Sequence, residues 1–341
     1  MKTALYASAA VIALAAFGTN AAFAQSRDTI QVAGSSTVLP FASIVAEEFS
    51  ASFPEFNTPV VGSGGTGGGL SQFCEGTGDN TIDIANASRQ IREGEMEACT
   101  AAGVTDVREI QFGFDGIVFA SAATGPDFAL TPVQVYKAIA AQVMVDGALV
   151  DNPYTNWSEI DASLPDQPIM MAVPAANHGT REVFQDEVVG AGCEEAGLPE
   201  GTSEEDAEAA CSTYRQDVVI EISGDYTETL ARLNSDSNTV GVFGLSFYEQ
   251  NTDTLKVATV NGVVPSKETV AAGEYPVSRP LFFYVKGQHI GVIPGLEEYV
   301  SYFLSEDVSG EGGILEAAGL IPQPADKTAE VLAAFEAGPT Q

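Results

Sequence analysis

Short apolar segments alternate with amphipathic ones along most of this chain, and this alternation restricts its fold more than any other feature. The apolar runs at residues 29–33, 82–85 and 239–243 have the length of buried strands. The first is followed by a polar turn and then by apolar residues at helical spacing, and the same order recurs after residues 59–61 and 168–173. This strand–turn–helix order predicts an α/β protein.

The first residues predict export. Lys2 is followed by an apolar, alanine-rich run at residues 4–17 and then by a small-x-small cleavage sequence that ends at Ala24. This is the pattern of a secretory signal peptide, here residues 1–24. No cysteine stands at the cleavage point, and no later stretch approaches ~20 uninterrupted apolar residues. We therefore expect a periplasmic or secreted mature protein without membrane insertion.

The mature length predicts two lobes, because about 315 residues exceed what one comfortable hydrophobic core holds. The apolar stretch at 107–121 is long enough to run from one lobe into the next. The stretch at 280–285 is interpreted as the return of the chain to the first lobe. We place the first lobe at residues 25–116 plus 280–341 and the second at residues 117–279.

The chain is strongly acidic, with 47 acidic and 14 basic residues and a net charge of −33. Removing the signal peptide takes away Lys2 and no acidic residue, so the mature charge is −34. Such a charge opposes binding to nucleic acid or to an anionic membrane, and it favours a monomer. The favoured explanation of this charge is a salt-adapted surface without meaning for any partner. Any anion must then be held by local dipoles, because the overall field repels it.

Four cysteines in an exported protein favour disulfides. Among the three possible pairings, Cys74–Cys99 with Cys193–Cys211 is the most local, and each bond would contribute on the order of 3 kcal/mol. The second pair would pin an acidic insert at residues 194–211, interpreted as a solvated excursion. The cysteine spacings match no common zinc pattern and the chain has only two histidines, so we expect no metal and no cofactor.

Two turns rich in glycine and hydroxyl residues could hold a small oxyanion, because each precedes a predicted helix. A helix N-terminus offers unpaired backbone N–H groups and a partial positive charge. Ordinary N-capping is the alternative for the turn at 34–38, and a flexible loop is the alternative for the glycine-rich turn at 62–69. The second turn lacks the Gly-Lys-Ser/Thr ending of a Walker loop. The candidate contacts are Ser36, Thr37, Val38, Ser63 and Gly64.

A third turn, at residues 177–181, adds an arginine to the same pattern. Arg181 stands in the first turn of a predicted helix, where a cation is unfavourable unless it meets an anion. A guanidinium can grip phosphate through two hydrogen bonds. Ser88 and Arg89 are a fourth candidate contribution, with a surface ion pair as the alternative. Each signal is weak alone, and their occurrence in one α/β chain strengthens the prediction of an anion site.

With these residues the chain resembles the periplasmic substrate-binding proteins of phosphate ABC transporters. The likeness covers nearly the whole mature chain and is carried, in the family's order and spacing, by residues 32–40, 62–67, 87–89, 115–117, 156–157, 178–181 and 240–244. The resemblance implies the type II periplasmic-binding fold, with two α/β lobes joined by two crossing strands. It also implies one dehydrated phosphate between the lobes and delivery to the permease subunits of an ABC importer.

The family's ligand contacts can be carried over by position. The resemblance assigns Thr37 and the Val38 amide to the first turn and Ser63 to the second. It assigns Gly179 and Thr180 to the third turn, and Arg181 fits the branch of the family whose turn reads Ser-Gly-Thr-Arg.

Two departures from the family pattern bear on selectivity. His178 stands where the family usually has serine, and it either accepts a hydrogen bond or packs at the turn. Ser88 stands where the best-known branch has an aspartate that accepts the proton of bound phosphate, whereas another branch has Ser-Arg there. Such an acceptor separates phosphate from sulfate, because fully ionised sulfate has no proton to donate. Asp115, on the predicted crossing strand, is the substitute candidate.

Two other classes of protein compete with a binding protein. A hydrolase could be built from Ser35, Ser36 and His178, but the chain has no Gly-x-Ser-x-Gly elbow and no Ser-x-x-Lys motif. A structural or adhesive surface protein would explain export, acidity and disulfides but not the polar turns. We therefore expect a binding protein and not an enzyme, with another oxyanion or a phosphonate as the alternative ligand.

Overall fold

The computed structural model describes residues 27–78, 80–175 and 179–338. The predicted signal peptide at 1–24 and His178 lie outside the described residues. Within those three ranges, no helix has both the length and the apolar character needed to cross a membrane.

The first part of the chain forms three parallel strands, in the order β2-β1-β3, with helices between them. Its elements are β1 (Gln31–Gly34), α1 (Leu39–Ser52), β2 (Val60–Ser63), α2 (Gly65–Phe73), β3 (Ile84–Ala87) and α3 (Glu93–Ala101). The predicted strand–turn–helix order is confirmed here, with strand bounds shifted by a few residues.

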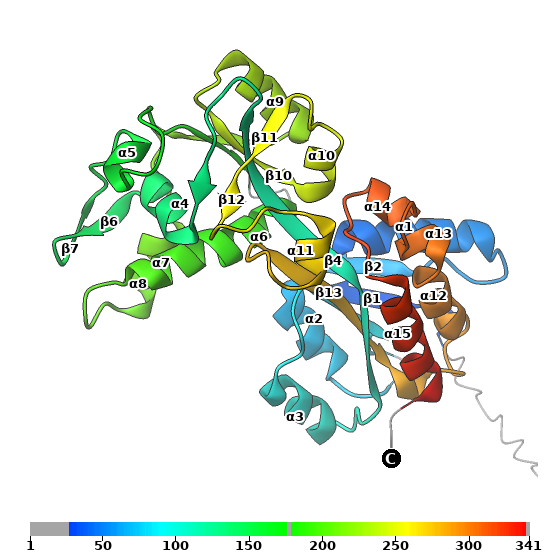
Figure 1. Cartoon of the computed structure of the whole chain (residues 1–341). Coiled ribbons are helices and arrows are strands. Elements are labelled where there is room, and N and C mark those ends of the chain that lie inside the picture. Colours follow the sequence, from blue (N-terminus) through cyan, green and yellow to red (C-terminus); the bar gives the residue numbers. More distant parts are fainter. Residues whose placement is uncertain (1–26, 79, 176–178, 339–341) are drawn as a thin grey trace, which may run out of the picture.

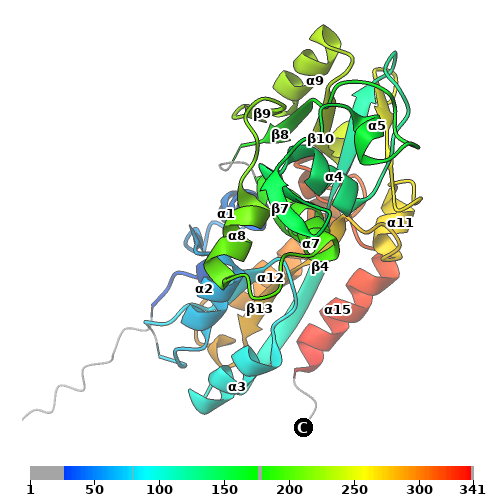
Figure 2. The ribbon, with the colours of Figure 1, turned by 90° about the vertical axis from the view of Figure 1, so that its left-hand side faces the viewer.

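Two long strands connect the lobes. β4 (Val107–Ala122) and β13 (Ser278–Lys286) pair antiparallel as far as Gly116 of β4. Beyond that point β4 continues into the second lobe, where it pairs with β10 (Val240–Gly244) and β11 (Leu255–Val257) (Figure 1 and Figure 2). With β8 (Met171–Pro174) and β9 (Val219–Ile222), the resulting sheet has the order β2-β1-β3-β13-β4-β10-β8-β9, and β11 is added on β4. The long apolar run predicted at 107–121 therefore belongs to the sheets of both lobes.

The second lobe lies between these two strands in the chain, and the C-terminal helices return to the first lobe (Figure 1). The elements of the second lobe are β5 (Ala129–Leu130), α4 (Pro132–Ile139), β6 (Gln142–Val145), β7 (Ala148–Asp151), α5 (Trp157–Ile160), β8 (Met171–Pro174), α6 (Gly179–Val183), a π-helix (Phe184–Gly190), α7 (Ala191–Ala196), α8 (Glu204–Ser212), β9 (Val219–Ile222), α9 (Tyr226–Ser235), β10 (Val240–Gly244), α10 (Leu245–Glu249), β11 (Leu255–Val257), β12 (Thr259–Val260) and α11 (Lys267–Ala271). After β13 come a 3-10 helix (Gly287–His289), α12 (Leu296–Phe303), α13 (Glu306–Ser309), α14 (Ile314–Ala317) and α15 (Ala325–Ala337).

Separate hydrophobic cores support the two lobes. The core of the second lobe draws on residues between Ile117 and Val277, with Ile321 added from the C-terminal part. In the first lobe, alternate residues of β13 belong to two different hydrophobic clusters. Phe283 is part of one cluster and Tyr284 is part of the other. Successive strand residues point to opposite faces, so this sheet is covered on both sides. The architecture is the two-lobed α/β fold that the resemblance implies.

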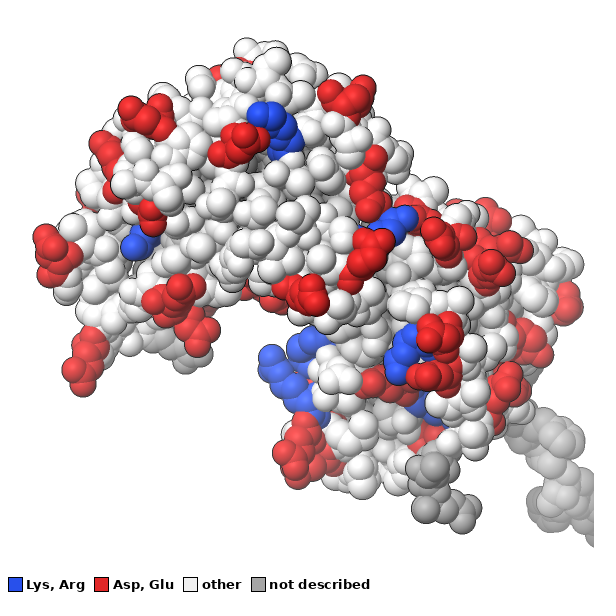
Figure 3. Space-filling view, viewed as in Figure 1, with Lys and Arg blue, Asp and Glu red and all other residues white. Residues whose placement is uncertain are grey.

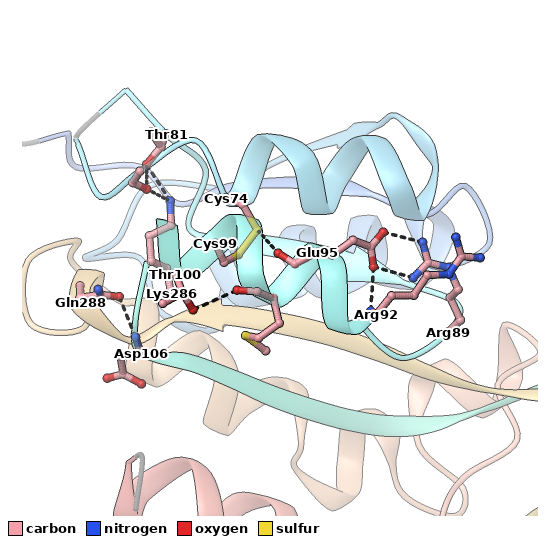
Figure 4. Close-up of a disulfide and its surroundings, with 12 residues drawn as sticks. Cys74, Thr81, Arg89, Arg92, Glu95, Cys99, Thr100, Asp106, Lys286 and Gln288 are labelled. Atoms are coloured by element: carbon pink, nitrogen blue, oxygen red, sulfur yellow. Dashed lines mark hydrogen bonds and ion pairs between the residues drawn. A yellow bond between two sulfur atoms is a disulfide. The ribbon is translucent and has the colours of Figure 1, made fainter. Parts of the chain in front are cut away.

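Both predicted disulfides are present, Cys74–Cys99 and Cys193–Cys211. The first ties the end of α2 to α3 (Figure 4). The second encloses the acidic insert, which is largely exposed, as expected, but contains α8 rather than only irregular chain.

Replacing Cys74 and Cys99 together by serine should lower the free energy of unfolding by about 3 kcal/mol, because the bond closes a loop of 25 residues. Urea denaturation would show a lower midpoint in the variant than in the oxidised wild type. The double serine variant of Cys193 and Cys211 is the matched control, with a similar or slightly smaller loss because its loop spans 18 residues. An unchanged midpoint in the first variant would contradict the expected contribution.

Candidate functional site

The carboxyl ends of three parallel strands meet at one edge of the first lobe. Gly34 of β1 pairs with Ser63 of β2 and with Asn86 of β3. The Ser63 hydroxyl lies 3.5 Å from the Ser36 hydroxyl, and the Ser35 amide donates to the Asn86 carbonyl at 2.9 Å. Gly34 is required there, because a Cβ would lie 2.1 Å from the Asn86 carbonyl oxygen. The first two predicted turns therefore adjoin at the sheet edge where α/β proteins commonly bind ligands.

Two helices begin at this edge without a cap from the side chain directly before them. α1 follows Val38, α2 follows Gly64, and neither helix has a capping hydrogen bond from its N-cap side chain. The Ser35 hydroxyl accepts instead from the Thr37 amide at 3.2 Å, inside the turn. The Ser35 carbonyl also accepts from the Leu39 amide, so Ser35 acts as a cap in the first turn, as the capping alternative expects. The hydroxyls of Ser36, Thr37 and Ser63 make other contacts.

Ser88 and Arg89 follow β3 at the same edge but have different surroundings. Ser88 is buried, and both its amide and its hydroxyl lie 3.1 Å from the Thr66 hydroxyl of α2. The Arg89 guanidinium donates to both carboxylate oxygens of Glu95, at 2.9 and 2.7 Å (Figure 4). This ion pair raises the pKa of Arg89 and lowers that of Glu95. Ser88 is thus buried against α2, while Arg89 forms the ion pair that was given above as the alternative to an anion contact.

The two lobes meet at the Thr37 hydroxyl. It accepts a hydrogen bond from Arg279 Nη2 at 2.7 Å and donates one to Glu182 Oε2 at 3.0 Å. Arg279 comes from β13 and Glu182 from α6, so three distant segments converge. Asp186 Oδ2 lies 3.5 Å from Arg279 Nη1, and Glu182 Oε1 lies 3.9 Å from Arg279 Nη2. Carboxylates from the second lobe thus face a buried guanidinium held on the crossing strand.

Asp115 lies beside Arg279 on the crossing strands. The two residues are directly opposite in the register of β4 and β13, so their side chains share one face of the sheet. Burial raises the pKa of Asp115 to about 6, although the positive charge of Arg279 opposes the shift, and the negative charge of Glu182 adds to it. A carboxylate with this pKa can take up or release a proton near neutral pH.

A cavity of about 510 Å³ lies between the lobes at this point. Thr37 and Asp115 line it together with Thr180 of α6, and Phe41 and Phe247 form part of its apolar wall. The cavity thus contains predicted site residues from the first turn, the crossing strand and the third turn.

The residues of the third turn are placed differently from one another. The Thr180 hydroxyl lines the cavity and bonds the Tyr226 hydroxyl. The Arg181 guanidinium donates to the Pro174 carbonyl at 2.8 Å and to Glu221 at 3.0 Å, and it stacks on the Tyr214 ring. All of these Arg181 partners belong to the second lobe, and Arg181 does not line the cavity. Gly179 begins α6.

Arg279 and Glu182 were not predicted as site residues. The predicted strand began at residue 280, one position after Arg279. The sequence signal that could have identified Arg279 is a cation directly before the apolar run by which the chain returns to the first lobe. Its position opposite Asp115 depends on the strand register, which the sequence alone does not show. Glu182 directly follows Arg181, but only the packing of α6 across the cleft brings it to Thr37.

The surface outside the cleft is acidic, as the composition predicts. Figure 3 shows acidic side chains distributed over both lobes and few basic ones on the face in view. Any attraction for an anion would therefore have to be local, because the surface as a whole is acidic and salt screens exposed charges over about 10 Å.

Several known proteins are similar to this chain in sequence. A family model described as a PBP superfamily domain matches residues 19–307. Protein SphX of Synechococcus elongatus is 31% identical over 336 residues, which cover 95% of this chain and 88% of that protein. The phosphate-binding protein PstS of Staphylococcus epidermidis is 27% identical over 296 residues, covering 85% of this chain and 78% of that protein.

Solved structures share the architecture. A possible phosphate binding protein from Planctomyces limnophilus superposes with a TM-score of 0.68 at 28% identity, covering 89% of this chain and 97% of that one. An ABC-type phosphate transport receptor from Vibrio cholerae superposes with a TM-score of 0.58 at 19% identity, covering 86% of this chain and 100% of that one. The second likeness concerns the fold alone.

The Asp115→Asn variant should be more stable than the wild type above pH 6, by about 1–2 kcal/mol. The folded protein holds the Asp115 proton up to a pKa of about 6, whereas the unfolded chain releases it near the model value of 3.8. The charged carboxylate therefore costs stability above pH 6, and this cost disappears as the pH falls towards 4. The full shift corresponds to about 3 kcal/mol, and we expect less because the carboxylate still meets solvent in the cavity.

Urea denaturation of ligand-free wild type and variant at pH 7.5, 6 and 4.5 measures this difference. A constant difference across the series would show that Asp115 is not the titrating group.

Proposed function

The chain belongs to the PBP superfamily and, within it, to the periplasmic phosphate-binding proteins, and on this premise we propose that it binds one inorganic phosphate ion between its lobes. The observation that carries the proposal is that Thr37 and Asp115 line one interlobe cavity, with Arg279 bonded to Thr37 and directly opposite Asp115. Hydroxyl, carboxylate and guanidinium together match a partly protonated oxyanion.

The proposed ligand set keeps the residues predicted from the sequence. Helix N-termini and hydroxyl groups at the strand edge support the contributions of the first two turns. The predicted contacts are Ser36, Thr37, Val38, Ser63, Gly64, Ser88, Arg89, Asp115, His178, Gly179, Thr180 and Arg181. Lobe closure would bring Thr180 and the amides of the third turn onto an ion held at the first lobe.

We assign the neutralising cation to Arg279. Its guanidinium is buried, it already donates to Thr37, and its Nε atom has no hydrogen-bond partner among the described residues. A buried donor without a partner carries a cost that a bound anion would relieve. The role predicted for Arg181 stays a prediction, since its present partners are Pro174, Glu221 and Tyr214.

We assign the phosphate proton to Asp115. In this position the carboxylate can accept the proton of monohydrogen phosphate, whereas fully ionised sulfate would face a bare negative charge. Only the ionised carboxylate is purely an acceptor, so this role needs a pH above the pKa of about 6 to which burial raises Asp115.

The wider function follows from the same proposal. The protein acts after export, as a monomer that hands phosphate to the permease of an ABC importer. The lobe boundaries at 116/117 and 279/280 belong to this proposal, and the separate cores support them. The family consists of binding proteins rather than enzymes, so the hydrolase considered from Ser35, Ser36 and His178 is not proposed.

Isothermal titration of ligand-stripped mature protein should give one-to-one phosphate binding that sulfate does not displace. In Asp115→Asn, phosphate should bind more weakly and sulfate should compete, because the acceptor for the phosphate proton is gone. Absence of binding in the wild type, at both moderate and high salt, would refute the proposal. An unchanged selectivity in the variant would remove Asp115 from its assigned role.

Arg279→Ala should weaken phosphate binding by at least about 2–3 kcal/mol, because the anion loses its buried counter-charge. Arg279→Lys, which keeps the charge but loses the planar fork, should lie between this variant and the wild type. Arg181→Ala, measured in the same titration, should change affinity less, since its partners lie in the second lobe. A larger loss in Arg181→Ala than in Arg279→Ala would reverse the assignment of the cation.

A further inference from the structure

Glu182 crosses the cleft to the groups that would hold the ligand. Arg279 can only donate, so the Thr37 oxygen accepts from it at 2.7 Å and the single Thr37 proton is directed to Glu182 at 3.0 Å. The other Glu182 oxygen lies 3.9 Å from Arg279. A carboxylate of the second lobe therefore consumes the hydroxyl donor of the first lobe and shares its guanidinium.

A carboxylate is itself an oxyanion, and it needs the same donors as phosphate. We propose that Glu182 is an internal competitor of the ligand, which occupies Thr37 and Arg279 in the ligand-free protein and must be displaced when phosphate binds. The inference rests on the proposed function. It adds a residue that sets the affinity for phosphate and couples phosphate binding to the contact between the two lobes.

Displacement, rather than joint occupancy, follows from the charges around Arg279. Four carboxylates, those of Asp115, Glu182, Asp186 and Glu187, already interact electrostatically with this one guanidinium. A phosphate dianion placed among them would be repelled unless one carboxylate left, because like charges at short range in a partly dry site repel strongly. The Thr37 hydroxyl also has only one proton, which cannot be donated to Glu182 and to the ligand together.

Glu182 is the carboxylate whose departure would free both Thr37 and Arg279. Its side chain is 32% exposed and begins on α6, so it can turn towards solvent without moving the crossing strands. Asp115 lies on β4 directly opposite Arg279 and is held by the sheet. Asp186 is more exposed, at 56%, and lies 3.5 Å from Arg279, but no recorded bond joins it to Thr37, so its departure would leave the hydroxyl donor occupied. The exchange of Glu182 for phosphate would thus replace one lobe-to-lobe bridge by another.

The alternative role for Glu182, acceptance of the phosphate proton, predicts the opposite effect of a neutral substitution. If Glu182 competes, Glu182→Gln should strengthen phosphate binding. If Glu182 accepts the proton, the same change should weaken binding and admit sulfate. The two roles are therefore separated by the sign of one affinity change.

The experiment compares wild type, Glu182→Gln and Glu195→Gln by titration with inorganic phosphate, with sulfate as competitor. Glu195 is exposed on α7, so its variant makes the same change in net charge away from the cleft. We expect Glu182→Gln to bind phosphate about tenfold more tightly or better, and Glu195→Gln to stay within about twofold of the wild type. Equal or weaker binding in Glu182→Gln than in Glu195→Gln would overturn the proposal.

A second measurement needs no phosphate. Small-angle scattering of the ligand-stripped proteins should show a larger radius of gyration for Glu182→Ala than for Glu195→Ala, because the bridge to Thr37 is lost. Identical scattering would overturn the bridging role. If no variant binds phosphate, the proposed function fails, and the scattering comparison alone then supports or overturns the Glu182 bridge.

Discussion

The pairing of β4 with β13 is the constraint on which the rest of this structure depends. It joins the sheets of the two lobes, and it places Asp115 directly opposite Arg279 at the level of the cleft. Both residues belong to strands that are paired along their length in the first lobe, so the acid and the base are held by backbone hydrogen bonds rather than by flexible loops. From the second lobe, Glu182 bonds Thr37 and Thr180 lines the cavity.

A strongly acidic protein can hold an anion only where its charges are organised locally. With a net charge of −33, the long-range field repels phosphate. At the cleft, the starts of α1 and α2 contribute N–H groups that no N-cap side chain satisfies, and Arg279 supplies a buried positive charge. The carboxylates of Glu182 and Asp186 lie near this arginine, which avoids the cost of an unpaired buried cation.

Contacts on the other side of the cavity complete the connection between the lobes. Lys267 of α11 pairs with Glu316 of α14, and the Ser246 hydroxyl lies 3.4 Å from the Gly319 carbonyl. The Lys267 contact is a partly exposed ion pair and therefore weak and sensitive to salt. Closure of the lobes around an ion would thus change several weak polar contacts between the lobes. Among them, the Thr37–Glu182 contact directly involves a residue proposed to bind the ligand.

The sequence by itself determined the layers and the turns of this protein. Its short apolar runs and helical spacings predicted the α/β order, the long run at 107–121 predicted the strand shared by both lobes, and cysteine proximity in the chain predicted both disulfides. These features are local, so residue periodicity and separation carry them. Thr37 was a candidate because it lies in such a turn, whereas Asp115 became one through the family resemblance, as the substitute proton acceptor on the predicted crossing strand. Only the tertiary structure decided that Arg279 stands opposite Asp115 and that Glu182 reaches Thr37, because strand register and packing across a cleft join residues far apart in the chain.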